Sequence, residues 1–412
     1  MRSCVTGIRT LVALLFILAT SGFAQGRGPK GSIVIPSSSL EKPGDRGKRA
    51  HTNIRMFVPA GGFKSPLPAA GGPPYSGYFF ETPASVACVY KLVAGIAGCN
   101  PTTVTANPTG GSKAIAIVDA FDDPNAASDL AYFSHQFGLP AAPFQVVYAS
   151  GTQPPSVLGW ELEESLDIEW SHAMAPKAKI YLVEAASDSF SDLFSAVQVA
   201  SNLVAAAGGG EVSMSWSTGD FYGESYFDSY FTTPGVVYFA SASDSPGPAY
   251  PSTSHNVVAA GGTTLRRHPV TGNFMSEAAW EYAGGGLTFN EVTPSYQAGI
   301  APLLSGGRGV PDVSAVADPN TGVWVYDSGN GGWWILGGTS VSSPVLAGIA
   351  NLAGHFATSS NVELSTIYNH MAVTTDFKDT VQGYCGYYMQ DSAVKGWDFC
   401  TGVGSPMGLL GK

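Results

Sequence analysis

From residue 113 onward, short apolar runs alternate with longer segments in which apolar residues recur at helical spacing. The first run, Ala114–Ala120, reads AIAIVDA and predicts a strand that is buried on both faces. Strands of this kind separated by helices predict an α/β fold, in which helices cover both faces of a mainly parallel central sheet. The predicted strands are Ala114–Ala120, Phe144–Ala149, Lys179–Ala185, Glu211–Trp216, Gly235–Ser243 and Asn256–Thr264, and the predicted helices are Asn125–Gly138, Leu162–Ala175 and Phe190–Ala207.

The chain begins with the pattern of a secretory signal peptide. Arg2 and Arg9 precede a short apolar run, Leu11–Ala19, which small residues follow. This run is shorter than the roughly 20 apolar residues needed to span a bilayer, so a membrane anchor is the weaker interpretation. We therefore predict a signal peptide at residues 1–24 and a protein secreted to the extracellular space or the periplasm. No membrane span is expected after its removal.

Residues 25–74 differ in composition from the rest of the chain. They hold eight Lys or Arg against two acidic residues, are rich in Pro, Gly and Ser, and show no periodicity. We interpret them as a short basic pro-segment or linker, with a tail that has no role as the alternative. The body, residues 75–412, holds ten basic and 29 acidic residues, a formal charge of −19. Such a body repels nucleic acid and anionic membrane surfaces.

Removal of the signal peptide leaves four cysteines, Cys88, Cys99, Cys385 and Cys400, in an oxidising compartment. Four cysteines allow three pairings, and no Cys-x-x-Cys spacing typical of a metal site occurs. We predict the local pairing, Cys88–Cys99 with Cys385–Cys400, because the two members of each pair lie within one short segment.

One serine lies in a setting that suits a nucleophile. The string GGTSVSSP, Gly337–Pro344, precedes an apolar helical run, Val345–Ala353. Its glycines allow a tight turn that places Ser340 at a helix N-terminus, where free N–H groups favour developing negative charge. A serine at a helix start is commonly only an N-cap. The whole Gly-Thr-Ser-x-x-x-Pro string, with Pro311–Ala315 upstream, resembles the nucleophile segment of subtilisin-type peptidases.

The base that such a serine usually needs is missing from the sequence. Subtilisin-type peptidases carry it in a His-Gly pair, and none of the seven histidines here is followed by glycine. A Ser-His-Asp triad is therefore disfavoured, and another group must activate Ser340. The histidines are His51, His135, His172, His255, His268, His355 and His370.

An acidic run on a predicted helix offers that other group. Glu163 and Asp167 are four residues apart and share a helix face, which Trp170 and Met174 continue toward the interior. Two close carboxyls in a shielded place share a proton, and the pKa of one of them rises. That carboxyl can act as general base to Ser340 and later as general acid to the leaving amine. Spacing alone leaves open a solvated acidic face and the neighbours Glu161, Glu164 and Glu169.

Four separated motifs occur in one order along the body. They are Glu-x-x-Leu-Asp-Ile-Glu from Glu163, Ala-Pro-x-Ala-Lys-Ile from Ala175, Ser-x-Ser-Trp from Ser213, and the Gly-Thr-Ser string. In this order they resemble the sedolisins, the serine-carboxyl peptidases, across about residues 75–412. The resemblance implies a subtilisin-like α/β fold, a protein or peptide substrate, and a Ser-Glu-Asp triad. The triad falls on Ser340, Glu163 and Asp167.

The resemblance also implies an aspartic acid in the oxyanion hole, and the matching residue is Asp244, in the segment Ser241–Gly247. A carboxyl donates a hydrogen bond to an oxyanion only when it is protonated, so such a site works in acid. Without the resemblance, Asp244 is a turn residue before Ser-Pro-Gly. The same likeness suggests two supporting residues, Asp119 beside the triad and Trp216 near the substrate cleft. Asp119 alternatively shapes a polar turn with its neighbours Asp122 and Asp123.

The C-terminal segments Phe377–Thr380 and Gly396–Pro406 resemble the calcium loops of the same family. Calcium prefers carboxylate and carbonyl oxygens. The resemblance implies one structural Ca²⁺ ion, and a Cys385–Cys400 disulfide would close the same loop. Val394 stands where glycine is usual and Phe399 where proline is usual, and a metal-free polar loop is the alternative. The implied ligands are the side chains of Asp379 and Asp398 and the carbonyls of Thr380, Val394 and Gly396.

We therefore predict a secreted, monomeric, acid-acting peptidase whose catalytic domain is residues 75–412; endopeptidase action is favoured, and exopeptidase action stays open. The alternative from another class is a catalytically silent secreted binding protein on the same fold, and a further alternative is a neutral, histidine-based hydrolase. Sedolisins typically carry a long folded activation domain. Here about 50 residues separate the predicted signal peptide from the body, which leaves the route of maturation open.

Overall fold

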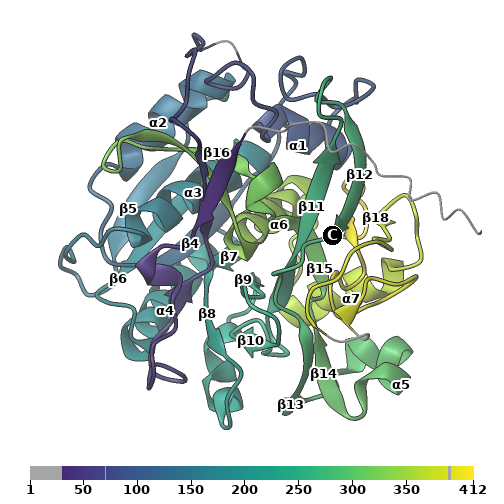
Figure 1. Ribbon diagram of the computed structural model, residues 1–412. Coiled ribbons are helices and arrows are strands. Elements are labelled where there is room, and N and C mark those ends of the chain that lie inside the picture. The colour runs from purple at the N-terminus through teal and green to yellow at the C-terminus, as the bar shows by residue number, and fades with distance from the viewer. Residues whose placement is uncertain (1–29, 70, 388–390) are drawn as a thin grey trace, which may run out of the picture.

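The computed structural model describes residues 30–69, 71–387 and 391–412, so the predicted signal peptide at residues 1–24 lies outside the described residues. An eight-stranded sheet runs through the body, and every strand pair in it except β11–β12 is parallel (Figure 1). The predicted α/β fold with a mainly parallel sheet is confirmed. In spatial order the strands are β12 (Phe274–Ala279), β11 (Val258–Arg267), β9 (Val236–Ser241), β7 (Gly210–Met214), β4 (Ala114–Ala120), β6 (Lys179–Ala185) and β5 (Phe144–Tyr148), with β15 (Val313–Val316) paired to β11.

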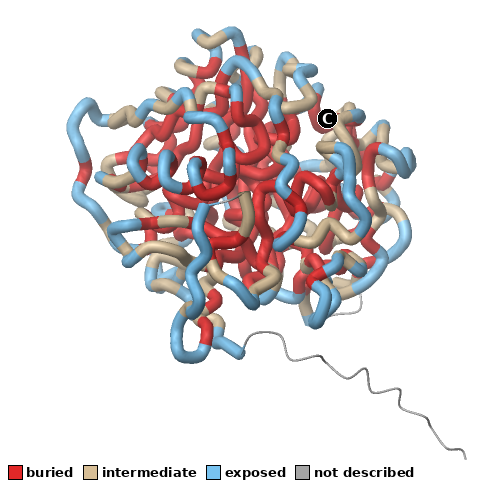
Figure 2. Tube along the Cα trace, turned by 90° about the horizontal axis from the view of Figure 1, so that it is seen from above, coloured by how far each residue is buried: buried red, intermediate tan, exposed pale blue. Residues whose placement is uncertain are grey.

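Helices cover both faces of this sheet because strand side chains alternate between two apolar cores. Ile115 and Ile117 of β4 belong to the core that α2, α3 and α6 share, whereas Ala116 and Val118 belong to the core under α4. Figure 2 shows the buried chain concentrated in the middle of the molecule. The helices are α1 (Pro83–Val89), α2 (Ala126–Phe137), α3 (Trp160–Met174), α4 (Phe190–Ala206), α5 (Ala301–Leu304), α6 (Thr339–Ala353) and α7 (Ser360–His370), with 3-10 turns at Ser37–Ser39, Glu224–Phe231, Ser295–Ile300 and Pro319–Thr321.

One predicted strand is divided in the structure. The segment expected at Glu211–Trp216 ends in the central sheet as β7, and the chain then continues as β8 (Trp216–Gly219). This second strand leaves the central sheet and lies between β2 (His51–Thr52) and β10 (Ala249–Tyr250) in a three-stranded sheet. The edge of β8 is therefore placed next to residues from the start of the chain.

The described part of the N-terminal segment, interpreted as a pro-segment or linker, packs into the body. Strand β3 (Arg55–Pro59) pairs with β17 (Gly332–Gly337) on one side and with β1 (Gly31–Val34) on the other. In Figure 1 this segment, coloured purple, crosses the middle of the molecule. Its function as a pro-segment remains a prediction. The sequence showed no periodicity here because these strands are short, and β2 and β3 pair with residues more than 150 positions away.

Small elements and two disulfides complete the fold. Cys88 pairs with Cys99 and Cys385 with Cys400, as predicted, with Cα–Cα distances of 5.4 and 5.3 Å. Among the residues that the structure describes, no helix is both long and apolar enough to cross a membrane. The remaining strands are β13 (Gly286–Val292), β14 (Gly307–Val310), β16 (Val323–Asp327), β18 (Phe377–Lys378) and β19 (Ser405–Pro406).

Candidate active site

Ser340 lies in the first turn of α6, where the sequence places it. Gly338 takes the N-cap position with a φ of 112°, a left-handed conformation that favours glycine. A Cβ on Gly338 would lie 1.9 Å from the carbonyl oxygen of Asn53 and 2.6 Å from Oδ2 of Asp244. The glycine therefore lets another part of the chain and an acidic side chain approach the start of the helix closely. Ser340 itself is fully buried.

The Ser340 hydroxyl has two partners. It donates to the carbonyl of Ser215 over 3.0 Å and accepts from the backbone N–H of Asn53 over 3.1 Å. The backbone N–H of Ser340 donates in turn to the carbonyl of Asn53 over 3.2 Å. Neither partner of the hydroxyl is a histidine, which agrees with the absence of a His-Gly pair from the sequence.

Three buried carboxyls surround the serine. Glu163 and Asp167 lie one turn apart on α3, and Asp119 is the next-to-last residue of strand β4. All three side chains are 0% exposed. Burial raises the pKa of Glu163 well above its usual value, and the charges of Asp167 and Asp119 raise that pKa further. The Ser340 hydroxyl lies close enough to Glu163 to lower the pKa of that carboxyl in part, although this hydroxyl donates its hydrogen bond to the carbonyl of Ser215.

The other two carboxyls of this group are shifted in the same direction. Burial raises the pKa of Asp167 well above its usual value, with a smaller contribution from Asp119. Burial raises the pKa of Asp119 to about 8. Neither carboxyl makes a hydrogen bond to the described residues, although the Ser215 hydroxyl lies close enough to Asp167 to lower its pKa in part. Three such groups cannot all carry a charge in this setting, so they hold protons in common in acid.

Asp244 follows β9 in a tight loop and points at the N-terminus of α6. Its Oδ1 accepts from the backbone N–H of Thr339 over 2.7 Å and from the Thr339 hydroxyl over 3.1 Å. Its Oδ2 is buried and finds no hydrogen-bond partner in the described residues. Burial raises the pKa of Asp244 to about 7, against the opposing effects of the Arg55 guanidinium and Thr339. The charged neighbour of Oδ2 is Nε of Arg55, 3.9 Å away, which is too far for a hydrogen bond, so Oδ2 can carry a proton and donate.

Trp216 lies in the core instead of lining the cleft. Its indole is fully buried and donates to the carbonyl of Val118 over 2.9 Å. The backbone of Trp216, in contrast, faces Thr52 across the β8–β2 pair. Trp216 thus fixes β8 against the central sheet, and its position near the cleft is that of its main chain.

A second carboxyl cluster lies beside the first and was not recognised from the sequence. Glu164 is fully buried and interacts with Glu184, and burial raises the pKa of both, to about 9 for Glu184. Burial also raises the pKa of Asp123 to about 7. Asp119 interacts with Glu164 as well as with Glu163, so it connects the two clusters. The fully apolar strand pattern on both sides of Asp119 was the available signal that these acids are buried.

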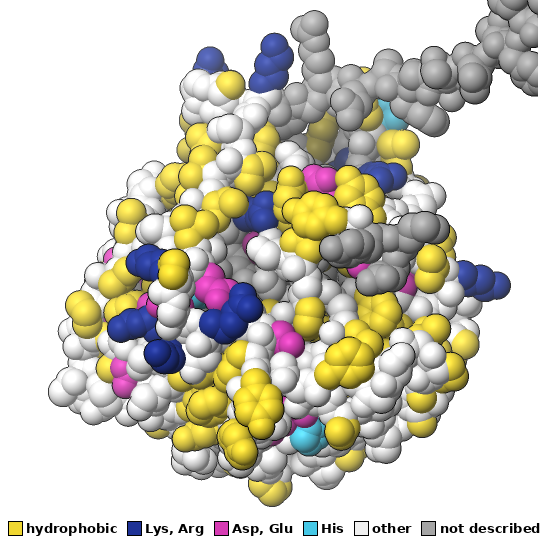
Figure 3. All heavy atoms as spheres, turned by 60° about the horizontal axis from the view of Figure 1, so that its bottom comes forward, with side chains coloured by type: hydrophobic (Ala, Val, Ile, Leu, Met, Phe, Trp, Pro, Cys, Tyr) yellow, Lys and Arg dark blue, Asp and Glu magenta, His cyan; other side chains and the backbone are white. Residues whose placement is uncertain are grey.

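A hollow of about 420 Å³ lies next to Asn53 and Asp244, which contact Ser340 and the N-terminus of α6. Its walls come from β8, from the loop around Asp244, and from the N-terminal segment through Glu41, His51 and Asn53. On the face shown in Figure 3, which carries β8 and β10, charged side chains form small separate groups among apolar and neutral polar ones. The cleft itself is polar and carries charges of both signs, since Glu41, Arg46, Asp220 and Asp244 line it.

The predicted calcium residues lie together in the C-terminal loop. Oδ2 of Asp398 accepts from the N–H of Val394 and Oδ2 of Asp379 accepts from the N–H of Gly396, at 3.0 and 2.9 Å. Oδ1 of Asp379 is buried and without a hydrogen-bond partner among the residues described. This carboxylate oxygen lies on the same loop as Val394 and Gly396, whose backbone carbonyls are further oxygen ligands, and the set fits a cation that prefers oxygen.

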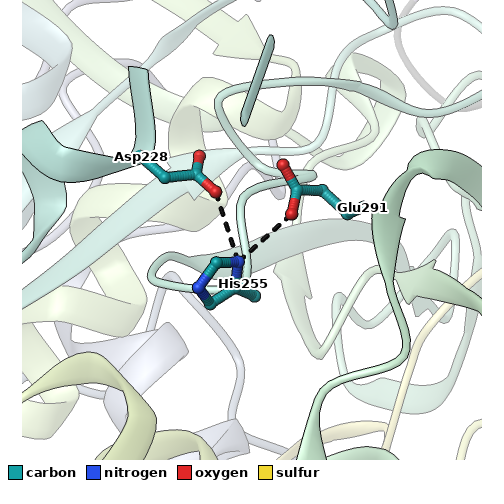
Figure 4. Close-up of side chains that lie close together, drawn as sticks. All are labelled: Asp228, His255 and Glu291. Atoms are coloured by element: carbon teal, nitrogen blue, oxygen red, sulfur yellow. Dashed lines mark hydrogen bonds and ion pairs between the residues drawn. The ribbon is translucent and has the colours of Figure 1, made fainter. Parts of the chain in front are cut away.

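A separate cluster could also hold a cation (Figure 4). The carboxylates of Asp228 and Glu291 lie 3.2 and 3.1 Å from Nδ1 of His255. Hydrogen bonds to these two carboxylates raise the pKa of His255 to about 9. Protonated His255 thus satisfies both acids, and a metal ion would have to displace that proton.

Comparisons with known proteins agree with this geometry. The chain is 28% identical over 364 residues to kumamolisin from Bacillus sp. (strain MN-32), which covers 80% of this chain and 62% of kumamolisin. It is 33% identical over 172 residues to sedolisin from Pseudomonas sp. (strain 101), which covers 38% of this chain and 28% of sedolisin. The chain thus spans less than two thirds of the length of these relatives. No family model matches it.

Solved structures give the same result for the fold. The structure of Pseudomonas sedolisin, a serine-carboxyl proteinase complexed with pseudo-iodotyrostatin, superposes with a TM-score of 0.65 at 20% identity, covering 79% of this chain and 95% of that one. Sphericase superposes with a TM-score of 0.50 at 16% identity, covering 80% of this chain and 99% of that one. The fold is subtilisin-like, and the chain is similar in sequence and in fold to members of the sedolisin family.

Proposed function

We propose that this chain is a secreted serine-type peptidase that hydrolyses protein or peptide substrates in acid through a Ser-Glu-Asp triad. One observation carries the proposal. Ser340 lies at a helix N-terminus beside the fully buried carboxyls of Glu163, Asp167 and Asp119, whose pKa values burial raises. A serine activated by carboxyls instead of histidine suits peptide-bond hydrolysis at low pH. The similarity to serine-carboxyl peptidases supports the same reaction.

Each side chain has a defined part in the proposed reaction. Glu163 takes the proton of the Ser340 hydroxyl as Oγ attacks the substrate carbonyl carbon, and later returns that proton to the leaving amine. Asp167 lies one turn further along α3 and adjusts the pKa of Glu163 by its charge. The oxyanion accepts hydrogen bonds from the Ser340 N–H and from protonated Asp244. Water then hydrolyses the acyl-enzyme.

The dependence on acid follows from Asp244. Its pKa of about 7 means that it carries a proton below pH 7 and loses it above. Once ionised, it presents a negative charge to an oxyanion and opposes the reaction. Activity should therefore fall as the pH rises through about 7.

A structural calcium ion is part of the proposal. Asp379 and Asp398 would supply carboxylate oxygens and Thr380, Val394 and Gly396 carbonyls, and the unpartnered Oδ1 of Asp379 supports this. Bound there, the ion would fix the loop that the Cys385–Cys400 disulfide closes. Secretion, a monomeric state and the division into signal peptide, pro-segment and catalytic domain remain predictions.

The test compares two neighbouring glutamates on α3. Glu163→Gln removes the proposed base and should lower the rate of peptide hydrolysis by about 10³-fold or more. Glu164→Gln is a matched control, because Glu164 is equally buried but faces the second carboxyl cluster. Equal activity of Glu163→Gln and wild type would refute the triad, and inactivity of every form at every pH would favour a silent binding protein.

A further inference from the structure

Three side chains that take no part in the proposed reaction converge outside the candidate active site. Asp228 belongs to the 3-10 turn Glu224–Phe231, His255 to the turn after β10, and Glu291 to strand β13. Figure 4 shows both carboxylates pointing at the same edge of the His255 ring. One oxygen of each acid and Nδ1 of His255 lie within 4.8 Å of one another.

Hydrogen bonds leave part of this cluster unsatisfied. Nδ1 of His255 can carry one proton, and its hydrogen bond goes to Oε2 of Glu291. Oδ2 of Asp228 faces the same nitrogen over 3.2 Å, yet it has no hydrogen-bond partner among the described residues, and neither has Oε1 of Glu291. Asp228 and Glu291 are only 6% and 4% exposed. Buried acceptors without a partner cost free energy, which a ligand that contacts both carboxylates would recover.

Charge balance favours a divalent cation over a proton at this place. Two ionised carboxylates at −1 each and one protonated His255 at +1 leave a net charge of −1. Arg308, which approaches His255 through the Tyr296 hydroxyl, already pairs with Asp312. A divalent ion bound to neutral His255 and both carboxylates would bring the net charge of the cluster to zero.

The type and spacing of the donor atoms fit a transition metal ion such as Zn²⁺. Imidazole nitrogen and carboxylate oxygen are both ordinary ligands of Zn²⁺, at about 2.0–2.2 Å. Bonds of that length put neighbouring ligand atoms of a tetrahedral site roughly 3.3 Å apart. Nδ1 of His255 lies 3.2 and 3.1 Å from the oxygens of Asp228 and Glu291. Ca²⁺ instead prefers about six to eight oxygen ligands, so this site differs in chemistry from the C-terminal loop.

Neighbouring hydroxyls hold the ligands in place. The Tyr250 hydroxyl donates to Oδ1 of Asp228 over 3.2 Å, and the Tyr296 hydroxyl donates to the backbone carbonyl of His255 over 3.1 Å. Contacts of this kind orient metal ligands and increase affinity. The His255 side chain is 39% exposed, which gives an ion a path from solvent and leaves one ligand position to water.

We propose that Asp228, His255 and Glu291 bind one divalent transition metal ion of the Zn²⁺ type, through Nδ1 of the imidazole and one oxygen of each carboxylate, with water as the fourth ligand. The ion is structural, because it joins three segments that are distant in sequence. The proposal does not depend on the function assigned to Ser340.

The bound ion would stiffen one wall of the hollow beside the candidate active site. Thr288 and Asn290 of β13 donate to the carboxylate of Asp220, which lines that hollow. Glu291 is the next residue of the same strand. Amide hydrogen exchange in residues 286–292 should therefore slow when Zn²⁺ binds, and unchanged exchange there would overturn this role of the ion.

The first experiment measures Zn²⁺ binding to the full-length Ser340→Ala chain, in which proteolysis is excluded. The protein is stripped of metal with a chelator, returned to buffer with Ca²⁺ to fill oxygen-only sites, and titrated with Zn²⁺ by calorimetry at pH 8. We expect one Zn²⁺ per chain. Tm should rise by at least about 2 °C when free Zn²⁺ exceeds the dissociation constant about 100-fold.

Variants of two histidines test which residues hold the ion. His255→Gln removes the nitrogen ligand and Glu291→Gln replaces a carboxylate, and each should weaken Zn²⁺ binding at least about tenfold. His370→Gln is the matched control. Nδ1 of His370 also pairs with a buried carboxylate, that of Asp376, and its side chain is 40% exposed, but no second acid completes a cluster among the described residues. His370→Gln should bind Zn²⁺ as the parent chain does.

Co²⁺ gives a readout that does not rely on the folding of a variant. Bound to the parent chain in place of Zn²⁺, it should show the intense visible absorption of a four-coordinate site, and the weak spectrum of hydrated Co²⁺ would overturn the proposal. Absence of stoichiometric Zn²⁺ binding, or equal affinity in His255→Gln, His370→Gln and the parent chain, would overturn it as well. Hydrolysis of casein in acid is a separate measurement on the wild type, so failure of the metal site and failure of the peptidase remain distinguishable.

Discussion

Asp244 is the residue whose replacement tests the chemistry most sharply. In Asp244→Asn, the amide oxygen can still accept from the Thr339 N–H at the position of Oδ1, 2.7 Å away, which directs the amide nitrogen to the place of Oδ2. The variant therefore keeps a donor to the oxyanion, and this donor does not titrate. In Asp244→Ala the donor is lost at every pH.

The size of each effect follows from the structure. Two donors are available to the oxyanion, the Ser340 N–H and Asp244, and loss of one such donor lowers kcat by about 10²–10³-fold, or roughly 3–4 kcal/mol in the barrier. Asp244→Ala should show this loss. In the wild type, ionisation of Asp244 above its pKa of about 7 removes the donor, so kcat should fall about tenfold per pH unit there. Asp244→Asn should extend activity by at least about one unit to higher pH.

The assay is hydrolysis of a chromogenic peptide by processed enzyme from pH 3 to pH 9, limited to conditions where circular dichroism shows the folded state. Asp192→Asn is the control, since Asp192 lies in the first turn of α4 and does not line the cleft, and its profile should match wild type. An unchanged high-pH limb in Asp244→Asn would refute the assignment of Asp244 as a proton-dependent donor.

Two further predictions concern stability. Burial raises the pKa of Asp119 to about 8, Glu184 to about 9 and Glu224 to about 9, so the folded state holds protons that the unfolded state releases above about pH 4. The contribution of these protonated groups to the free energy of unfolding is complete below that pH and is lost as the pH rises through 8 to 9, by up to about 1.4 kcal/mol per group per pH unit. Urea unfolding of Ser340→Ala at pH 4, 6 and 8 should therefore show a falling free energy of unfolding. A free energy of unfolding that rises with pH would contradict this prediction. Chelation with EGTA should lower Tm, and Asp398→Asn should abolish this response while Asp228→Asn retains it. A Tm that EGTA leaves unchanged would count against the C-terminal calcium site.

Much of the fold was accessible from the sequence because its central strands are continuous apolar runs. Ala114–Ala120 could only be buried on both faces, and the segments around it alternated between strand and helix. The strands β1 to β3 were missed, since they are short and show no alternation of their own, and β2 and β3 pair with distant segments. Long-range pairing leaves no local signal in one sequence.

The candidate site could also be predicted from the sequence in part. Ser340, Glu163, Asp167 and Asp244 were named from motifs. The structure brings them together because α3 packs against α6 and the loop after β9 reaches the N-terminus of α6. Spacing on α3 could not show that Glu164 and Glu169 are buried as deeply as Glu163. Nothing near Asn53 in the sequence indicates that it lies against Ser340, since that contact joins residues 287 positions apart.

The most direct test of the central claim is hydrolysis of an unfolded protein from pH 2.5 to pH 8 by wild type and Ser340→Ala, each purified and incubated in acid. We predict activity confined to acid in the wild type, and a loss on the order of 10⁶-fold in the variant with unchanged folding. Full activity of Ser340→Ala, or a wild-type optimum near pH 7, would contradict a serine peptidase that works through buried carboxyls.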